Sequence, residues 1–297
     1  SVAILFECID SVSLPPGTVN LLNGHLSQIT PHLLQSPLVR KVSFTGSVGI
    51  GKMIAKESAE TLKKVTLELG GHAPVIIYPD VDVQTVAKQC VHAKFRNAGQ
   101  ICVSPTRFYV HRSIQTEFVN AFVDATKALR LGSPLESGTD MGPLASRRRV
   151  EQLKLLIEDA CSRGAVLATG GGSVDVVEGG NFFAPTVLQD VPVAARVMQE
   201  EPFGPLALVN GFESSRQVID DANATPFGLA AYAFTQSLQS SYEAAEGLQA
   251  GIVSINTFAA SSTEIPFGGI KESGYGRECG SHAIKEYLVS RTVNIAH

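Results

Sequence analysis

A single thiol, Cys102, stands in the stretch FRNAGQICVSPTR at residues 95–107, between a Gly-Gln step and a Ser-Pro step. A loop cysteine can attack a carbonyl carbon once it has lost its proton, because the thiolate is a strong nucleophile. The alternative is that Cys102 is a small buried hydrophobe, which is the commonest role of a free cysteine. The thiol alone does not decide between these roles, so the residues around it have to be considered.

A carboxylate, Glu68, lies in the stretch TLELGGHAP, directly before Leu69 and the pair Gly70-Gly71. Apolar flanks tend to raise the pKa of a carboxyl group, which suits a general base near neutral pH. Glu68 and Cys102 are 34 residues apart. One predicted strand and one predicted helix separate them, so a βαβ crossover would return both to the same edge of the structure. There the thiol could form a thioester and the carboxylate could direct water onto it. The alternative for Glu68 is an exposed polar strand end.

Three glycines, Gly46, Gly49 and Gly51, lie in the stretch FTGSVGIG at the start of a predicted helix. The free backbone N–H groups and the positive end of a helix suit a phosphate group. This stretch is not the G-x-G-x-x-G fingerprint, so a plain strand-to-helix turn is the alternative.

The composition is that of a soluble globular protein of about two domains. The chain has 297 residues, of which 44% are hydrophobic and 18% are charged, with a net charge of -4. Its longest block of like charge is Arg147–Arg149, so we expect no nucleic-acid partner. Five cysteines without a C-x-x-C pair argue against disulfides and a metal site, and favour a reducing compartment. No apolar run reaches the roughly 18 residues that span a bilayer, so we expect no membrane partner.

Helical and strand patterns alternate along the chain, which indicates an α/β fold built of βαβ units around a parallel sheet. In the first part of the chain, strands are predicted at 18–24, 39–46, 64–71, 72–79 and 106–113. Helices are predicted near 29–36 and at 46–64, 81–99, 113–130 and 147–164.

The motifs FTGSVGIG, LELGGHAP, GQICVSPTR, EEPFGP and PFGGIKESGYGRE closely resemble those of the NAD(P)-dependent aldehyde dehydrogenase superfamily, in order and in spacing. The resemblance spans nearly the whole chain and is closest to succinate-semialdehyde and 2-oxoglutarate-semialdehyde dehydrogenases. It implies the carboxy-terminal portion of an aldehyde dehydrogenase fold. That portion would comprise a partial Rossmann-like dinucleotide-binding domain at 1–69, an α/β catalytic domain at 70–285 and a C-terminal oligomerisation strand within 286–297.

The resemblance also implies roles for single residues. Cys102 would be the nucleophile and Glu68 the general base. We expect Cys102 to be the most reactive of the five thiols, because it lies in a loop aimed at the proposed cofactor cleft, where a lowered pKa would be useful. NAD or NADP would be the cofactor, with no metal. The residues implied at the cofactor are Gly46 and Ser47 at the pyrophosphate, Leu69 beside the nicotinamide, and Glu201 and Phe203 at the nicotinamide ribose and ring. The alternatives are core packing for Leu69 and Phe203, and a helix-end carboxylate for Glu201.

The sequence departs from the family pattern upstream of residues 18–24. An Asn that shares the oxyanion with the Cys102 N–H group, and a Lys that holds the adenosine ribose, both belong to that upstream region. We therefore expect that roughly the first two-fifths of a family chain is missing here. That part carries the residues that choose NAD over NADP.

The substrate class is suggested by Arg96, six residues before Cys102. Succinate-semialdehyde dehydrogenases carry Arg there, whereas many relatives that oxidise apolar aldehydes carry an aromatic residue. The stretch SSTEIPFGG resembles their substrate-side loop, with Ser261 or Ser262 facing the acid end. An Arg fork and a Ser hydroxyl suit a carboxylate, although an interdomain salt bridge is the alternative for Arg96.

The function implied is oxidation of a small aldehyde, such as succinate semialdehyde, to its acid with reduction of NAD(P). Two alternatives stay open: a truncated, catalytically incompetent chain with a structural or oligomer-forming role, and a cysteine hydrolase without nicotinamide. We expect a homodimer or homotetramer in the cytoplasm, with the mitochondrial matrix as the alternative location.

Overall fold

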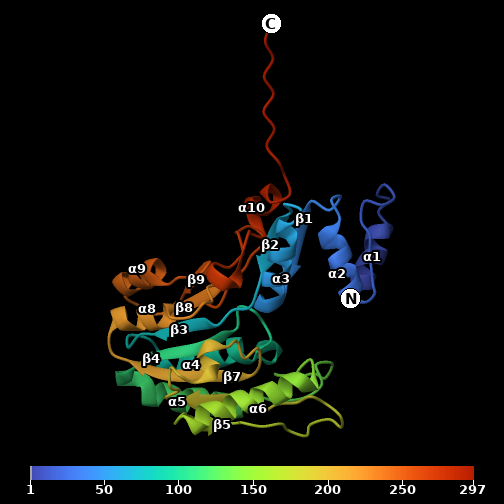
Figure 1. The fold of residues 1–297 in the computed structure, drawn as a ribbon. Helices are drawn as coiled ribbons and strands as arrows, with labels where there is room; N and C mark the ends of the chain where they lie inside the picture. The colour runs from blue at the N-terminus through green and yellow to red at the C-terminus, as the bar shows by residue number, and fades with distance from the viewer. Residues whose placement is uncertain (1) are drawn as a thin grey trace.

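The computed structural model describes residues 2–297, and its strands form two separate sheets (Figure 1). The smaller sheet has the order β1-β2-β10 and consists of β1 (Lys41–Thr45), β2 (Lys64–Glu68) and β10 (Gly274–Tyr275). The larger sheet has the order β5-β6-β7-β4-β3-β8-β9. Its strands are β3 (Ala73–Ile77), β4 (Pro105–His111), β5 (Val166–Thr169), β6 (Thr186–Gln189), β7 (Leu206–Phe212), β8 (Ala230–Phe234) and β9 (Ile252–Ile255).

Helices cover both faces of the larger sheet. The helices α4 (Val83–Phe95), α5 (Arg112–Lys127) and α6 (Arg147–Ser162) contribute to the main apolar core, and α8 (Ser215–Asn223) and α9 (Leu238–Gly247) to a second one. All five residues of β3 are buried, as expected of a parallel strand that is covered on both faces. The predicted α/β fold is therefore confirmed.

The smaller sheet is formed from both ends of the chain. β1 and β2 run parallel, and β10 pairs with β2 in the antiparallel direction. The helices α2 (Leu26–Gln35) and α3 (Val48–Ala59) lie nearby, and Leu34, Ile54, Leu67 and Leu69 form a small apolar core there. The remaining helical segments are α1 (Val2–Asp10), η1 (Arg96–Gly99), α7 (Arg196–Gln199), η2 (Lys271–Ser273) and α10 (Gly280–Lys285).

One strand prediction was wrong. Residues 18–24 contain no strand, and Val19, Leu21 and Leu22 are exposed. A strand needs a hydrogen-bonded neighbour, and within residues 2–297 the only strand beside β1 is β2. Residues 286–297 likewise form no strand within this single chain, and the chain extends away from the body after Leu288, whose carbonyl accepts a hydrogen bond from Lys64 (Figure 1). Their role in oligomerisation stays a prediction.

Candidate active site

Cys102 and Glu68 approach one another from different sheets. Glu68 is the last residue of β2, whereas Cys102 lies three residues before β4. The two groups come together as predicted, but not through a βαβ crossover within one sheet, because the chain changes sheets between Glu68 and Ala73. The crossover β3-α4-β4 returns Cys102 to the amino end of β4, where Ala73 pairs with Pro105. The two groups consequently lie at the junction of the sheets.

Gly71 brings the segment after Glu68 against the backbone of Cys102. A Cβ atom on Gly71 would lie 2.4 Å from the Cys102 carbonyl oxygen, which is too close for any side chain. On the other side, Asn97 and Ala98 have φ values of 51° and 54° in the left-handed region. Each costs roughly 1 kcal/mol or more in a residue with a Cβ atom. This strained turn directs the chain from α4 into the Cys102 loop.

The thiol of Cys102 is partly exposed, and its pKa is raised. Burial is the largest cause, the negative charges of Glu201 and Glu68 add to it, and the Val103 amide opposes it. The chain by itself therefore does not supply the lowered pKa that would be useful for a reactive thiol. A protonated thiol needs a base to take its proton before it can attack a carbonyl.

Glu68 has the properties of a general base that could activate water. Burial raises the pKa of its carboxyl from 4.5 to about 8, with a further increase from Glu278 and an opposing effect of Arg277. Glu68 is 3% exposed, and both of its carboxyl oxygens lack a hydrogen-bond partner within the described residues. The raised pKa agrees with the apolar flanks in the sequence. The unsatisfied oxygens leave the carboxyl free to accept a proton.

A cavity of about 730 Å³ opens beside the thiol. Cys102, Arg96 and Ser261 all line it, and its volume is in the range of about 300 to 1,000 Å³ that is usual for ligand sites. Ser262 does not line the cavity, because its hydroxyl donates a 2.6 Å hydrogen bond to Glu264. No ion pair formed within residues 2–297 includes Arg96, so the salt-bridge alternative is not observed there.

The glycine-rich motif begins α3 beside β2. The Gly46 N–H group donates a 3.0 Å hydrogen bond to the Glu68 carbonyl, and Ser47 is the N-cap residue, whose hydroxyl makes no capping bond. No atom lies within 4 Å of a Cβ placed on Gly49, so the first turn has open space. The free N–H groups at the start of this 12-residue helix fit a phosphate of a dinucleotide.

Leu69 packs tightly on that helix. A Cβ on Gly51 would lie 2.5 Å from the Leu69 side chain, which is 3% exposed and belongs to the small core. Leu69 thus takes part in core packing, and its contact with a nicotinamide ring stays a prediction.

Glu201 is anchored to the glycine pair after Glu68. Its carboxylate accepts a 3.1 Å hydrogen bond from the Gly71 N–H group, and a Cβ on Gly70 would lie 2.3 Å from it. Burial raises the pKa of Glu201 to about 7. Because α7 ends at Gln199, Glu201 is not a helix-end carboxylate. Phe203, two residues on, has its ring 5.7 Å from the Arg149 guanidinium. These contacts place Glu201 beside the glycine pair that follows Glu68, and the roles of Glu201 and Phe203 at the nicotinamide ribose and ring stay predictions.

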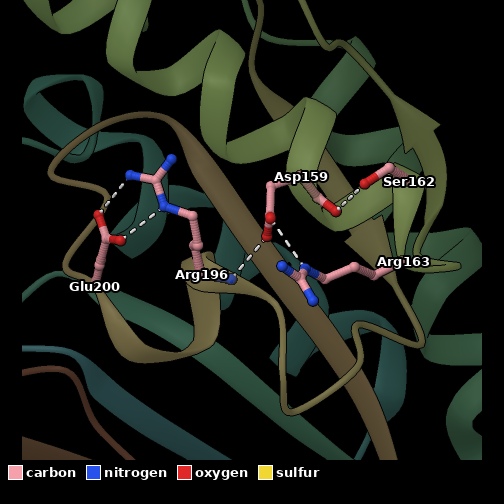
Figure 2. A network of polar contacts seen from close by, with 5 residues as sticks. All are labelled: Asp159, Ser162, Arg163, Arg196 and Glu200. Carbon is pink, nitrogen blue, oxygen red and sulfur yellow. Dashed lines mark hydrogen bonds and ion pairs between the residues drawn. The ribbon is translucent and has the colours of Figure 1, made fainter.

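Polar contacts between α6 and α7 hold the start of that loop (Figure 2). The Asp159 carboxylate accepts bonds from the Arg196 backbone N–H group at 2.8 Å and from the Arg163 side chain at 2.9 Å. The Arg196 side chain in turn donates two bonds to Glu200, at 2.9 and 3.1 Å. Glu200 directly precedes Glu201, so the network positions the loop through its first residue.

Lys94 is a buried cation that the sequence analysis missed. It is 1% exposed, and its Nζ donates a 3.2 Å hydrogen bond to the Ser104 hydroxyl. Burial lowers the pKa of Lys94 to about 7, which the Glu201 carboxylate opposes. The signal was in the sequence, because Lys94 follows Val86 and Cys90 at four-residue spacing and so falls on the buried face of α4.

Two kinds of feature are absent from residues 2–297. None of their helices is both long and apolar enough to span a membrane. The same residues contain no group of three or more His, Cys, Asp or Glu side chains that could hold a metal ion.

A family model described as the aldehyde dehydrogenase family matches residues 1–293. The chain belongs to the aldehyde dehydrogenase family. It is 46% identical over 288 residues to a 4-(hydroxymethyl)benzenesulfonate dehydrogenase of Comamonas testosteroni. Over 288 residues it is also 41% identical to the NADP-dependent succinate-semialdehyde dehydrogenase of Escherichia coli. Each alignment covers 97% of this chain and 59% of the relative, so the chain spans about three-fifths of the length of these relatives.

Solved structures of the family have the same fold. An NADP-dependent enzyme of E. coli is 41% identical with a TM-score of 0.93, covering 96% of this chain and 59% of that one. A betaine aldehyde dehydrogenase of Staphylococcus aureus in complex with NAD+ is 36% identical with a TM-score of 0.94, covering 98% of this chain and 58% of that one. The resemblance seen in the motifs is therefore confirmed.

Proposed function

We propose that the protein containing this chain oxidises an aldehyde to the corresponding acid with NAD(P)+ as the oxidant. The observation that carries the proposal is the junction of the sheets, where the Cys102 thiol, the unsatisfied Glu68 carboxyl and a ligand-sized cavity come together. The intact pair argues against loss of the chemistry by substitution, and the cofactor-side motifs argue against a cysteine hydrolase without nicotinamide. The alternative of a truncated, inactive chain stays open for these 297 residues alone, so the activity is proposed for the full natural chain.

The chemistry has two halves. A base takes the Cys102 proton, the sulfur bonds to the aldehyde carbon, and the aldehyde oxygen becomes an oxyanion. NAD(P)+, when bound, accepts the hydride that leaves this carbon. The Cys102 N–H group is one donor toward the oxyanion, and such a donor contributes about 2.7 to 4 kcal/mol. Glu68 then takes a proton from water as the water adds to the thioester, and the acid leaves as the Cys102 sulfur regains a proton.

We further propose a short substrate with an anionic end, such as succinate semialdehyde. Arg96 and Ser261 line the cavity with Cys102 and supply a cation and a hydroxyl for that end. Relatives 40% and 41% identical to the chain are named as dehydrogenases of glutarate semialdehyde and succinate semialdehyde. A homodimer or homotetramer in the cytoplasm is part of the same proposal.

The test is the formation of reduced cofactor from an aldehyde by the full natural chain that contains these residues. Cys102→Ala should abolish it, whereas Cys161→Ala, at a partly exposed thiol of α6, should leave it nearly unchanged. Equal activity in both variants would refute the proposal.

A further inference from the structure

One face of α4 carries basic side chains that line the cavity. Lys88, His92 and Arg96 follow one another at four-residue spacing, so they lie on the same side of the helix. All three line the cavity that also contains Cys102. This face lines the cavity, whereas Val86, Cys90 and Lys94 lie on the buried face of the helix.

The charged side chains that line the cavity are all basic. No Asp or Glu is among the residues that line it, and within residues 2–297 neither Lys88 nor Arg96 belongs to an ion pair. The carboxylate of Asp82, at the start of α4, has an electrostatic interaction with Lys88 but forms no ion pair with it. This carboxylate instead accepts a 2.7 Å hydrogen bond from the Thr85 N–H group. Lys88 and Arg96 are therefore available to an anionic ligand.

The cavity is also larger and more aromatic than a four-carbon aldehyde requires. Tyr232 and Phe258 line it, with ring centroids 4.9 Å apart, and Tyr232 is held by a 2.7 Å hydrogen bond from its hydroxyl to the Val103 carbonyl. Because a helix rises 1.5 Å per residue, Lys88 lies about 12 Å farther along the α4 axis than Arg96. Arg96 is at the end of α4 from which the chain continues to Cys102, so Lys88 marks the far end.

We propose that Lys88 and His92 bind the anionic group of an aromatic aldehyde, a sulfonate or carboxylate carried on the ring, at a distance from Cys102 that a four-carbon semialdehyde does not reach. For the short substrates, Arg96 alone of these three residues binds the anionic end. This inference rests on the proposed function, since it assigns a second substrate class to the same site.

The experiment measures binding on a Cys102→Ala background of the full natural chain, so that the aldehyde makes no bond to sulfur. The probes are 4-formylbenzenesulfonate, 4-formylbenzoate, uncharged benzaldehyde and succinate semialdehyde, titrated by calorimetry. The double variant Lys88→Gln/His92→Gln should bind at least one of the two aromatic anions about tenfold more weakly, and benzaldehyde and succinate semialdehyde within about twofold of the parent. Of the two aromatic anions, the one whose affinity falls more in the double variant is the preferred ligand.

Two controls make the result specific. Lys127→Gln removes a cation from α5, outside the cavity, and should change no affinity. Lys88→Arg keeps the charge and should keep the affinity of the aromatic anions.

Equal weakening of all four probes, or unchanged binding of both aromatic anions, would overturn the inference. Turnover is scored separately on the chain with Cys102 intact. Failure of every aldehyde to reduce NAD(P)+ there would reject the proposed function, while the calorimetric comparison still decides the role of Lys88 and His92.

Discussion

Arg96 is the residue on which the proposed substrate class depends. Its side chain is exposed and lines the cavity, so the pair it forms with a substrate carboxylate is partly solvated and near the lower end of about 1.5 to 3 kcal/mol. Arg96→Ala should therefore lower kcat/KM for succinate semialdehyde by about tenfold, since each 1.4 kcal/mol is a factor of about ten. The value for uncharged butanal should change little. Equal losses on both aldehydes would make Arg96 a structural residue.

The buried carboxyl of Glu68 should make the stability of the fold depend on pH. Its pKa is about 8 in the folded chain, against 4.5 for an ordinary carboxyl, so the unfolded chain ionises first as the pH rises. The free energy of unfolding contributed by this group therefore falls between pH 4.5 and about 8 and is constant above that range.

Glu68→Gln removes that ionisation. At a pH above 8 the variant should be more stable than the parent by roughly 1 to 3 kcal/mol, because the parent then holds an ionised carboxylate in a buried site whereas the Gln amide stays neutral. Denaturant unfolding of both proteins at low and high pH measures the difference. A parent and variant that keep the same gap at every pH would show that Glu68 is not titrating within the fold.

At the scale of elements, the segment that joins the two sheets sets the position of the thiol. Gly71→Ala would force a methyl group against the Cys102 carbonyl oxygen, which lies 2.4 Å from the Cβ position. Backbone shifts of this kind cost roughly 1 to 3 kcal/mol. We expect a lower melting temperature and a loss of kcat of at least tenfold, because a small misplacement of a reacting group is costly.

Gly172→Ala is the matched control for that variant. Gly172 has no atom within 4 Å of its Cβ position, so the added methyl group meets open space. Thermal melting and turnover of the two variants, measured side by side, give the comparison. A Gly71→Ala enzyme as active as the Gly172→Ala enzyme would refute the role of the junction.

The helices and strands also show which features of the fold local sequence patterns can predict. The alternation of apolar strands and helices predicted β3, α4 and β4 because each pattern is local. It did not predict that β2 and β3 belong to different sheets, because strand pairing depends on contacts distant in sequence. For the same reason the sequence does not show that burial and the carboxylates of Glu201 and Glu68, distant from Cys102 along the chain, raise the pKa of the thiol. β5 and β6, of four residues each, were too short to give a pattern.

At the scale of the whole molecule, apolar side chains are exposed at both ends of the described chain. Val2, Ile4 and Leu5 of α1 are about three-fifths exposed, and Val293 and Ile295 are 63% and 75% exposed. The alternation of Val293 and Ile295 suits one face of a strand. A second copy of the chain would supply the hydrogen-bonding neighbour that such a strand needs.

Deletion of residues 289–297 should therefore reduce the molar mass of the assembly, measured by light scattering during gel filtration. The truncation keeps the 2.6 Å hydrogen bond from the Lys64 side chain to the Leu288 carbonyl, so the body of the fold should remain intact. Circular dichroism of the truncated protein checks this. An unchanged molar mass would rule out these residues as the oligomerisation strand.

The most direct test of Cys102 and Glu68 is to trap the acyl group between the two halves of the reaction. The Glu68→Gln variant of the full natural chain is mixed with NAD(P)+ and succinate semialdehyde, quenched in acid and digested for mass spectrometry. Because the carboxyl that activates water is gone, the thioester should accumulate, and the acyl mass should appear on the peptide that carries Cys102. An acyl group on Cys161 or Cys279, or reduced cofactor formed without any acylated cysteine, would contradict the assignment of Cys102 as nucleophile.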